Sequence, residues 1–406
     1  MVVERRFFVA ALKDSEFLMS IETHLPFQFL SELYVRDFSS ACLLPEYPSS
    51  NSDETFFQNR TKYLIHDPFP PPPRELLKVL GPHHLMCGWG RQIEIVSEVP
   101  PSSILLDHWK AVFGAEGVPN WRSFDAFDRD SKFIPLFPHQ SISADQQVLD
   151  PEINYLLHSK EIIEKIDCPQ AGVLESITPP CIVKLSHGYA GLGNFLIRSE
   201  SDETEMRKQF APYGNEAVLV INSIIENIVG DFGVQFYLRT DGSIVWLGFT
   251  AQHFDSNKKW CGGTFSAEWQ EQLLPDLCKM IEPAGKYLHE CGYVGVVGID
   301  ILRDASNNMF LVDVNPRLTG ITPFLMASRI FAREGLNEGI YQASCRFQGS
   351  FSRLVSEAES IKNARVLVHS AFESGSDGDI TTICHLSVTT DSQDRNQQVL
   401  QQILQS

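Results

Sequence analysis

The chain has 406 residues, of which 43% are hydrophobic and 21% are charged, values ordinary for a globular protein of two or three domains. A formal net charge of -18 argues against a nucleic-acid partner, since binding a polyanion needs a basic surface. The sequence has no secretory-type signal and no apolar run of about 18 residues, which predicts a cytoplasmic protein without a membrane partner. Its nine cysteines are scattered and form no Cys-x-x-Cys pair, which predicts reduced thiols.

The first 150 residues have the least regular pattern. Phe7–Leu12 resembles a buried strand, and a run of prolines between 68 and 73 precedes a predicted helix over Arg74–Val79. Ser102 and Ser103 offer an N-cap for a helix over Ile104–Phe113. Loop-forming residues dominate from 119 to 147. We therefore predict an N-terminal α/β domain over residues 1–150.

The pattern becomes regular after residue 150. Residues 155–166 have the spacing of an amphipathic helix. A long helix is predicted over Ala267–Cys291, with breaks at Pro275 and Pro283. The Asp241-Gly242 pair indicates a type I′ hairpin turn. The other predicted elements of this region are strands over Ile182–Leu185, Phe195–Ile197, Ala217–Ile221, Gly233–Leu238 and Ser243–Phe249, and helices over Asp202–Phe210 (capped by Ser201 or Asp202) and Phe324–Arg333. Arg365–Phe372 and Thr381–Val388 indicate two later strands before a Gln-rich terminal helix.

A hairpin is predicted where Val294–Leu302 and Met309–Val314 flank a polar turn. In such a hairpin Asp300 and Asp313 lie close to opposite one another. Side chains two apart in a strand share a face, so Asp313 and Asn315 can contact one ion. Carboxylate and amide oxygens are the ligands that Mg²⁺ prefers. The alternative is a plain strand that ends in an Asn-Pro turn.

A glycine-rich loop lies between two predicted strands. Gly188, Gly191 and Gly193 allow backbone amides to approach a ligand closely, as in loops that wrap phosphates. Lys184, just before the loop, stands in an apolar strand, where a lysine is disfavoured unless its ammonium reaches an anion. The alternative is a flexible hairpin without a ligand.

Taken together, these blocks resemble the ATP-grasp superfamily. The similar residues run from Pro180-Cys-Ile-Val-Lys-Leu-Ser-His-Gly-Tyr-Ala-Gly-Leu-Gly through Gly-Ile-Asp at 298–300 to Val-Asp-Val-Asn-Pro-Arg-Leu at 312–318, and the resemblance spans residues 155–335. It implies an α+β ATP-grasp fold, in which two α+β subdomains clasp ATP, preceded by the α/β domain. We expect this domain over 151–345, with a lid at about 170–225 and a C-terminal extension over 346–406 that packs on its core.

The resemblance also implies roles for individual residues. Lys160 and Lys184 match the lysines that contact phosphates, and Arg317 matches an arginine that faces the reacting groups. We expect Arg317 and Lys184 to be catalytic. The implied metal ligands are Asp300, Asp313 and Asn315, with aspartate at 313 where glutamate is commoner. The implied nucleotide-binding residues are Lys160, Lys184, His187, Gly188, Gly191, Gly193, Asn222, Ile225 and Asp231.

Several of these assignments have alternatives. Lys160 could be an ordinary surface lysine, and His187 an exposed loop histidine. The hinge Val218–Ile225 would line the adenine, but the glutamate usual in the family near Asn222 is missing. Gln235 is a weaker substitute for Asp231 as the ribose ligand.

The activity implied is that of an ATP-dependent carbon–nitrogen ligase. Such an enzyme activates a small carboxylic acid, for which an amino acid is one candidate, as an acyl phosphate and joins it to an amine, releasing ADP and phosphate. The cofactors expected are ATP and Mg²⁺, with Mn²⁺ as a second option. The partners are small carboxylate and amine substrates, and a homodimer is left open. The alternatives are a thioester product, a kinase-like phosphotransferase, or an inactive nucleotide-binding regulatory protein.

Three further groups carry weaker signals. His83, His84 and Cys87 have a metal-ligand spacing but lack further ligands, which favours a structural role. Residues 260–265 are glycine-rich and aromatic, typical either of a mobile substrate loop or of a plain connector. Cys261 has no visible base, so we do not expect a nucleophile there.

Overall fold

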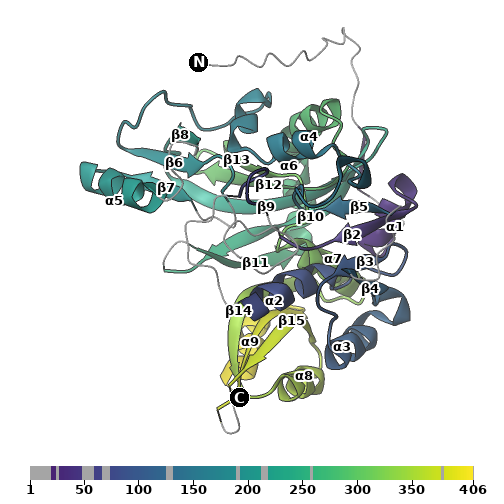
Figure 1. The fold of residues 1–406 in the computed structure, drawn as a ribbon. Helices are drawn as coiled ribbons and strands as arrows, with labels where there is room; N and C mark the ends of the chain where they lie inside the picture. The colour runs from purple at the N-terminus through teal and green to yellow at the C-terminus, as the bar shows by residue number, and fades with distance from the viewer. Residues whose placement is uncertain are drawn as a thin grey trace.

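The computed structural model describes residues 20–23, 27–47, 59–65, 74–124, 131–188, 193–211, 218–256, 259–375 and 379–405. These residues form three sheets with helices packed on them (Figure 1). The strand predicted at Phe7–Leu12 and the proline cluster lie outside the described residues. Within the described part of the chain, no helix is long and apolar enough to cross a membrane.

The N-terminal sheet has the parallel strand order β4-β3-β2-β5. The α/β prediction for this region is confirmed, and Ser102 caps α3 by accepting a hydrogen bond from the Leu105 amide. The loop predicted over 119–147 is wrong in part, because β4 and β5 lie there as strands too short to show a period. The bounds are α1 (Leu30–Asp37), β2 (Ala41–Leu44), α2 (Arg74–Met86), β3 (Ile95–Ser97), α3 (Ser103–Phe113), β4 (Trp121–Ser123) and β5 (Lys132–Pro135).

The largest sheet has the order β13-β12-β9-β10-β11-β14-β16-β15, and β1 (Ile21–Glu22) pairs with β10. Its first half consists of β9 (Ile228–Leu238), β10 (Ile244–Phe254), β11 (Trp260–Ser266), β12 (Gly295–Asp304) and β13 (Met309–Asn315). Residues 260–265, expected to form a loop, are therefore a strand. In the β9–β10 turn the Gly242 amide donates to the Arg239 carbonyl and only Gly242 of the predicted pair has a positive φ, so the turn is not type I′.

Helix α6 (Ala267–Glu290) covers this half of the sheet and is continuous, contrary to the breaks expected at its two prolines. Its buried face includes Leu277, Ile281 and Leu288, which join the core formed with β9, β10 and β12. Most helical stability in proteins comes from such packing. Burial of this face therefore outweighs the two backbone hydrogen bonds that the prolines cannot make.

A separate sheet of three strands, β7-β6-β8, carries α5. It has its own small core around Val183, Ile197 and Met206. The bounds are β6 (Cys181–Leu185), β7 (Asn194–Ile197), α5 (Glu200–Phe210) and β8 (Leu219–Ser223). The predicted strands and helix are confirmed, although Ser199 rather than Ser201 or Asp202 caps α5.

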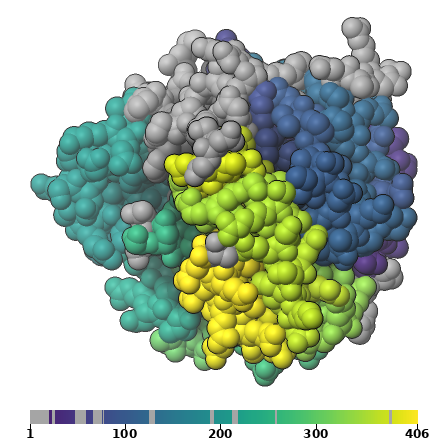
Figure 2. Space-filling view, turned by 90° about the horizontal axis from the view of Figure 1, so that it is seen from below, coloured from purple at the N-terminus to yellow at the C-terminus, as the bar shows by residue number. Residues whose placement is uncertain are grey.

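The C-terminal segments continue the large sheet. They are α7 (Thr322–Ala332), β14 (Glu338–Gln348), α8 (Phe351–Ser360), β15 (Arg365–Ser374), β16 (Thr381–Thr390) and α9 (Gln393–Gln405). In Figure 2 this part, green to yellow, lies beside the blue N-terminal part. Trp109 of α3 donates to the Val368 carbonyl at 3.0 Å, and the Val368 amide donates to His108 at 3.1 Å. The N-terminal sheet region and the C-terminal strands of the described chain are thus packed together. The three-part division expected from the sequence stays a prediction.

Candidate active site

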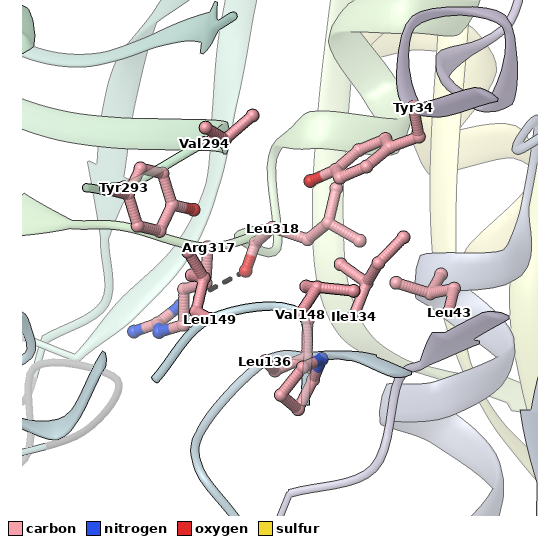
Figure 3. Close-up of a pocket in the computed structure, with 11 residues that line it drawn as sticks. Tyr34, Leu43, Ile134, Leu136, Val148, Leu149, Tyr293, Val294, Arg317 and Leu318 are labelled. Carbon is pink, nitrogen blue, oxygen red and sulfur yellow. Dashed lines mark hydrogen bonds between the residues drawn. The ribbon is translucent and has the colours of Figure 1, made fainter. Parts of the chain in front are cut away.

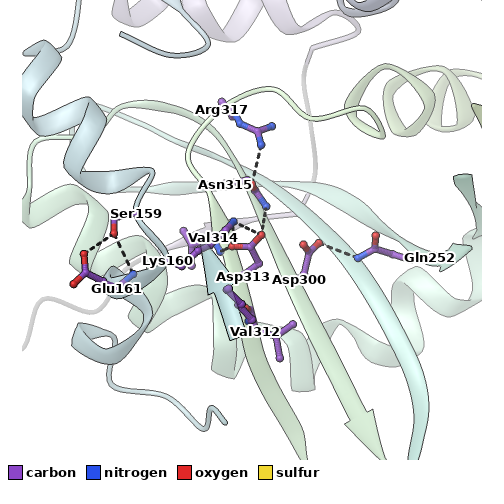
Figure 4. A network of polar contacts seen from close by, with 11 residues as sticks. Ser159, Lys160, Glu161, Gln252, Asp300, Val312, Asp313, Val314, Asn315 and Arg317 are labelled. Carbon is purple, nitrogen blue, oxygen red and sulfur yellow. Dashed lines mark hydrogen bonds and ion pairs between the residues drawn. The ribbon is translucent and has the colours of Figure 1, made fainter. Parts of the chain in front are cut away.

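The hairpin of β12 and β13 forms the centre of the site. Asp300 pairs with Asp313 in its register, so the predicted juxtaposition of the two carboxylates is confirmed. Antiparallel pairing places directly opposed side chains on one face of the sheet. Gln252 of the nearby strand β10 donates to Asp300 at 2.9 Å (Figure 4). The sequence did not point to Gln252, because a glutamine in a strand carries no distinctive signal.

Lys160 reaches this hairpin from a short 3₁₀ helix. The single helix predicted over 155–166 is wrong: α4 (Pro151–Leu157) ends at His158, and Ser159 then caps a 3₁₀ helix over Lys160–Lys165. The break is stabilised by the Lys160 amide, which donates to the Ser186 carbonyl at 2.7 Å. Lys160 is only 7% exposed and its ammonium forms an ion pair with Asp313, so it is not a surface lysine.

Lys184 approaches from the three-stranded sheet. Its ammonium donates to the Val312 carbonyl of β13 at 2.8 Å. Burial lowers the pKa of Lys184, an effect that the charge of Asp313 opposes. Asn222 lies on the neighbouring strand β8, in register with Ile182. Lys160, Lys184, Asn222 and Val312 line one hollow between the three-stranded sheet and the large sheet.

The two aspartates have opposite electrostatic settings. Burial raises the pKa of Asp300 to about 7, and the neighbouring charges of Asp313 and Asp231 add to the shift. Burial also acts to raise the pKa of Asp313, but Lys160 and Lys184 outweigh it and hold that pKa below its usual range. A carboxylate that is buried beside another one is stabilised by a cation. Burial of Asp300 beside Asp313 therefore favours a cation at this carboxylate, where the charge of Lys160 already acts to lower its pKa.

Asn315 and Arg317 extend this network away from the hairpin. The Asn315 amide donates to Asp313 at 3.4 Å, and Arg317 donates to the Asn315 side-chain oxygen at 2.9 Å. The Arg317 guanidinium lies over the ring of Phe137 at 5.1 Å. It also borders a small pocket between the N-terminal sheet and the large sheet, where Tyr34, Leu136 and Tyr293 lie close by (Figure 3).

The donor set fits a hard divalent cation. Asp300, Asp313 and Asn315 supply oxygens at one hairpin end, and the described residues contain no cluster of three or more His, Cys, Asp or Glu that could hold a metal. Mg²⁺ typically takes one or two carboxylates and completes its shell with water and phosphate oxygens. The donor set thus suits Mg²⁺ that completes its shell with water and phosphate oxygens.

The remaining predicted nucleotide-binding residues follow strand β6 or lie at strands β8 and β9. His187 stacks on Tyr155 with ring centroids 3.9 Å apart, so it is not an exposed loop histidine. Gly188 precedes the loop and Gly193 ends it with a φ of +84°, while Gly191 lies outside the described residues. Ile225 lies in the connection between β8 and β9.

Asp231 and Gln235, the two candidates for a ribose ligand, differ in their surroundings. Both lie on β9, and burial raises the pKa of Asp231 to about 6. Gln235 is 2% exposed and accepts a hydrogen bond from Thr322 at 2.8 Å. The side chain of Gln235 is thus engaged in holding the segment that follows Arg317, which favours Asp231 as the residue available to a ligand.

The weaker candidates have structural surroundings. His83 and His84 lie on α2, and His84 contacts the Gly320 carbonyl at 2.6 Å. Burial lowers the pKa of both histidines. Burial raises the pKa of the Cys261 thiol, which is unfavourable for a nucleophile.

Comparisons with known proteins agree with this geometry. A sequence model of the family described as "L-aspartate--L-methionine ligase, ATP grasp" matches residues 159–315. The [butirosin acyl-carrier protein]--L-glutamate ligase of Niallia circulans is 21% identical over 206 residues, which cover 47% of this chain and 49% of that protein. The chain thus spans about half the length of this curated relative. N5-carboxyaminoimidazole synthetase from Staphylococcus aureus, complexed with ADP, has a similar fold with a TM-score of 0.50 at 14% identity, covering 79% of this chain and 94% of that one.

Proposed function

We propose that this chain is a member of the ATP-grasp superfamily and an ATP-dependent ligase, which joins a small carboxylic acid to an amine and releases ADP and phosphate. The observation that carries the proposal is the convergence of two lysines, two aspartates and an arginine on the end of one hairpin. Lys160 and Lys184 both contact β13, and Arg317 lies two residues beyond the end of this strand.

The nucleotide would lie in the hollow between the three-stranded sheet and the large sheet. Lys160 and Lys184 line this hollow and would face the phosphates, with Asp231 available for the ribose. Asn222 at its wall would stand near the adenine. Asp300, Asp313 and Asn315 would hold Mg²⁺, which neutralises phosphate charge when bound.

Formation of an acyl phosphate brings a carboxylate against the γ-phosphate of ATP. Two anions repel one another, so the reaction needs cationic groups on both sides of the bond that forms. Lys160 and Lys184 meet this need on the phosphate side. Arg317, fixed by Asn315 and Phe137, is placed to bind the incoming carboxylate.

In the second step an amine attacks the carbonyl of the acyl phosphate. Negative charge develops on the carbonyl oxygen, and Arg317 would stabilise it. Water would hydrolyse the intermediate, so the reaction needs a site that excludes water.

An amino acid is the substrate class that we favour. The matched family description and the curated relative both name amino acids, aspartate and methionine in one case and glutamate in the other. Each amino acid can be tested both as the acid and as the amine, and the result would identify which of the two reactants is the amino acid.

The test is to measure ADP release with ATP, Mg²⁺ and a panel of amino acids and small carboxylates, with hydroxylamine added to trap the acyl phosphate as a hydroxamate. We expect ADP and hydroxamate to appear together, and only with the correct acid. ADP release independent of any acid, or hydroxamate without ADP, would overturn the proposal.

A further inference from the structure

The inner face of α4 has polar atoms that are buried but unpaired. Asn154 is 1% exposed and His158 is 5% exposed. Among the described residues, neither the side-chain oxygen nor the nitrogen of Asn154 has a hydrogen-bond partner, and neither does Nε2 of His158. Residues four apart on a helix share a face, so the two side chains are neighbours. Buried polar groups are nearly always paired, which indicates that this face receives a polar ligand.

The other ring nitrogen of His158 determines what Nε2 can do. Nδ1 lies 2.8 Å from the Asn154 backbone carbonyl, which can only accept a hydrogen bond. Nδ1 therefore carries the proton and Nε2 carries a lone pair. Burial holds the pKa of His158 well below its ordinary value, and the charges facing it from Arg317, His187 and Lys160 act in the same direction. His158 is thus a neutral hydrogen-bond acceptor.

His158 also lies next to the residue assigned to the reacting bond. Its ring packs on Phe137 with centroids 4.2 Å apart, and Phe137 in turn lies under the Arg317 guanidinium at 5.1 Å. Two residues further along the chain, Lys160 pairs with Asp313. His158 is therefore linked to Arg317 through Phe137 and to Lys160 through the chain.

An amine must present its nitrogen lone pair to the carbonyl when it attacks, and it loses a proton when it becomes an amide. Resting on the ligase function proposed above, we propose that Asn154 and His158 bind the neutral amine substrate near Arg317, and that Nε2 of His158 accepts a hydrogen bond from the attacking nitrogen and so orients its lone pair. The C–N bond forms as this lone pair attacks the carbonyl carbon. The C–O bond to phosphate breaks, its electron pair leaves with the phosphate, and the phosphate takes the proton that the nitrogen loses. The ring of His158 stays neutral throughout.

The test separates the two half-reactions in the His158→Gln variant. Acyl phosphate formation, measured as ATP- and acid-dependent hydroxamate, precedes the attack of the amine and does not use Nε2. We expect this rate to stay within about twofold of the wild type, while amide formation falls by about 100-fold or more. His158→Phe, which keeps the ring stacked on Phe137, should show the same split.

The split between the two half-reactions distinguishes a residue that binds the amine from a structural residue. In the variant, the amine concentration needed for half-maximal amide formation should rise, while the acid dependence of hydroxamate formation should stay unchanged. A purely structural role predicts loss of both half-reactions together. That result, or unchanged amide formation, would overturn the proposal.

A matched control is His83→Gln, which also removes a buried histidine but lies on α2, where its ring contacts the Val99 carbonyl at 3.0 Å. Both of its half-reactions should match the wild type once thermal unfolding shows that it is folded. Failure of the ligase function itself would appear differently: wild-type protein would then form neither hydroxamate nor amide with any acid.

Discussion

The nucleotide side of the candidate site and the side around Arg317 are built in different ways. On the nucleotide side, Asp300 and Asp313 lie opposite one another in a hairpin, and Lys184 is held by the backbone of the same hairpin. On the other side, Phe137, His158 and Arg317 come from separate segments that meet by side-chain packing. Strand register thus positions the groups that would hold the nucleotide, whereas tertiary contacts position those that would hold the second substrate.

This difference predicts two kinds of defect. Changes on the nucleotide side should reduce hydroxamate and amide formation equally, because both need the acyl phosphate. Changes confined to the Arg317 side should reduce amide formation alone, or reduce it more than they reduce hydroxamate formation. Arg317 itself belongs to both steps and marks the border between the two sides.

The largest effect is expected for Asp313→Asn. The variant keeps the shape of the side chain but loses the charge that pairs with Lys160 and would hold the metal. We expect ADP formation to fall by about 1000-fold, with both half-reactions affected equally. The measurement is acid-dependent ADP release, accompanied by thermal unfolding to show that the fold is retained.

Asp304→Asn is the matched control for this prediction, since Asp304 lies at the turn of the same hairpin and accepts from the Ser306 and Asn308 amides. Its ADP release should be close to wild type. Near-normal turnover of Asp313→Asn itself would rule out the assignment of Asp313 to the metal.

A smaller effect is expected for Arg317→Lys. Lysine keeps the charge but cannot reproduce the planar fork that contacts Asn315 and lies over Phe137. We expect about a 100-fold loss in amide formation, with a smaller loss in hydroxamate formation. Rates with saturating acid and amine provide the measurement. An equal loss in the two half-reactions would place Arg317 wholly on the nucleotide side.

Gln252→Leu should have a weaker and more specific effect. Gln252 donates to Asp300, so its loss leaves this carboxylate less firmly oriented. We expect the Mg²⁺ concentration needed for half-maximal ADP binding to rise about 10-fold, because groups behind a metal ligand tune its affinity. A Mg²⁺ titration of ADP binding measures this without turnover. An unchanged titration would show that Asp300 is oriented by the hairpin alone.

The sequence predicts the nucleotide side better than the other side for a physical reason. The placement of Asp300 opposite Asp313 depends on hairpin spacing and the two-residue period of a strand, which are local. The end of α4 at His158 is not local: the apolar spacing continues through Ile162 and Ile166, and the break depends on the Lys160 amide bonding to Ser186. A single helix was therefore predicted where two are present.

Strand β11 was missed for a related reason. Gly262 has a φ of +152°, and a Cβ there would lie 2.0 Å from the Tyr341 carbonyl oxygen of β14. The glycines of this segment permit close contact between strands, yet in the sequence they have the appearance of a loop. The strand exists because β10 and β14 pair with it on both sides. The two strands that pair with β11 lie about ten and eighty residues away in the sequence.

The smallest predicted effect is that of Ser159→Ala, which tests how the two sides are joined. Ser159 lies between His158 and Lys160, and its side chain caps the 3₁₀ helix by accepting from the Glu161 amide at 3.2 Å. Loss of a cap lowers stability by about 1 kcal/mol. His158 belongs to the Arg317 side and Lys160 to the nucleotide side, so a shift of this short segment should affect both. Both half-reactions should therefore fall together by no more than about fivefold, as measured with hydroxylamine and with the amine. A selective loss of amide formation, like that expected for His158→Gln, would instead show that Ser159 positions His158 independently of Lys160.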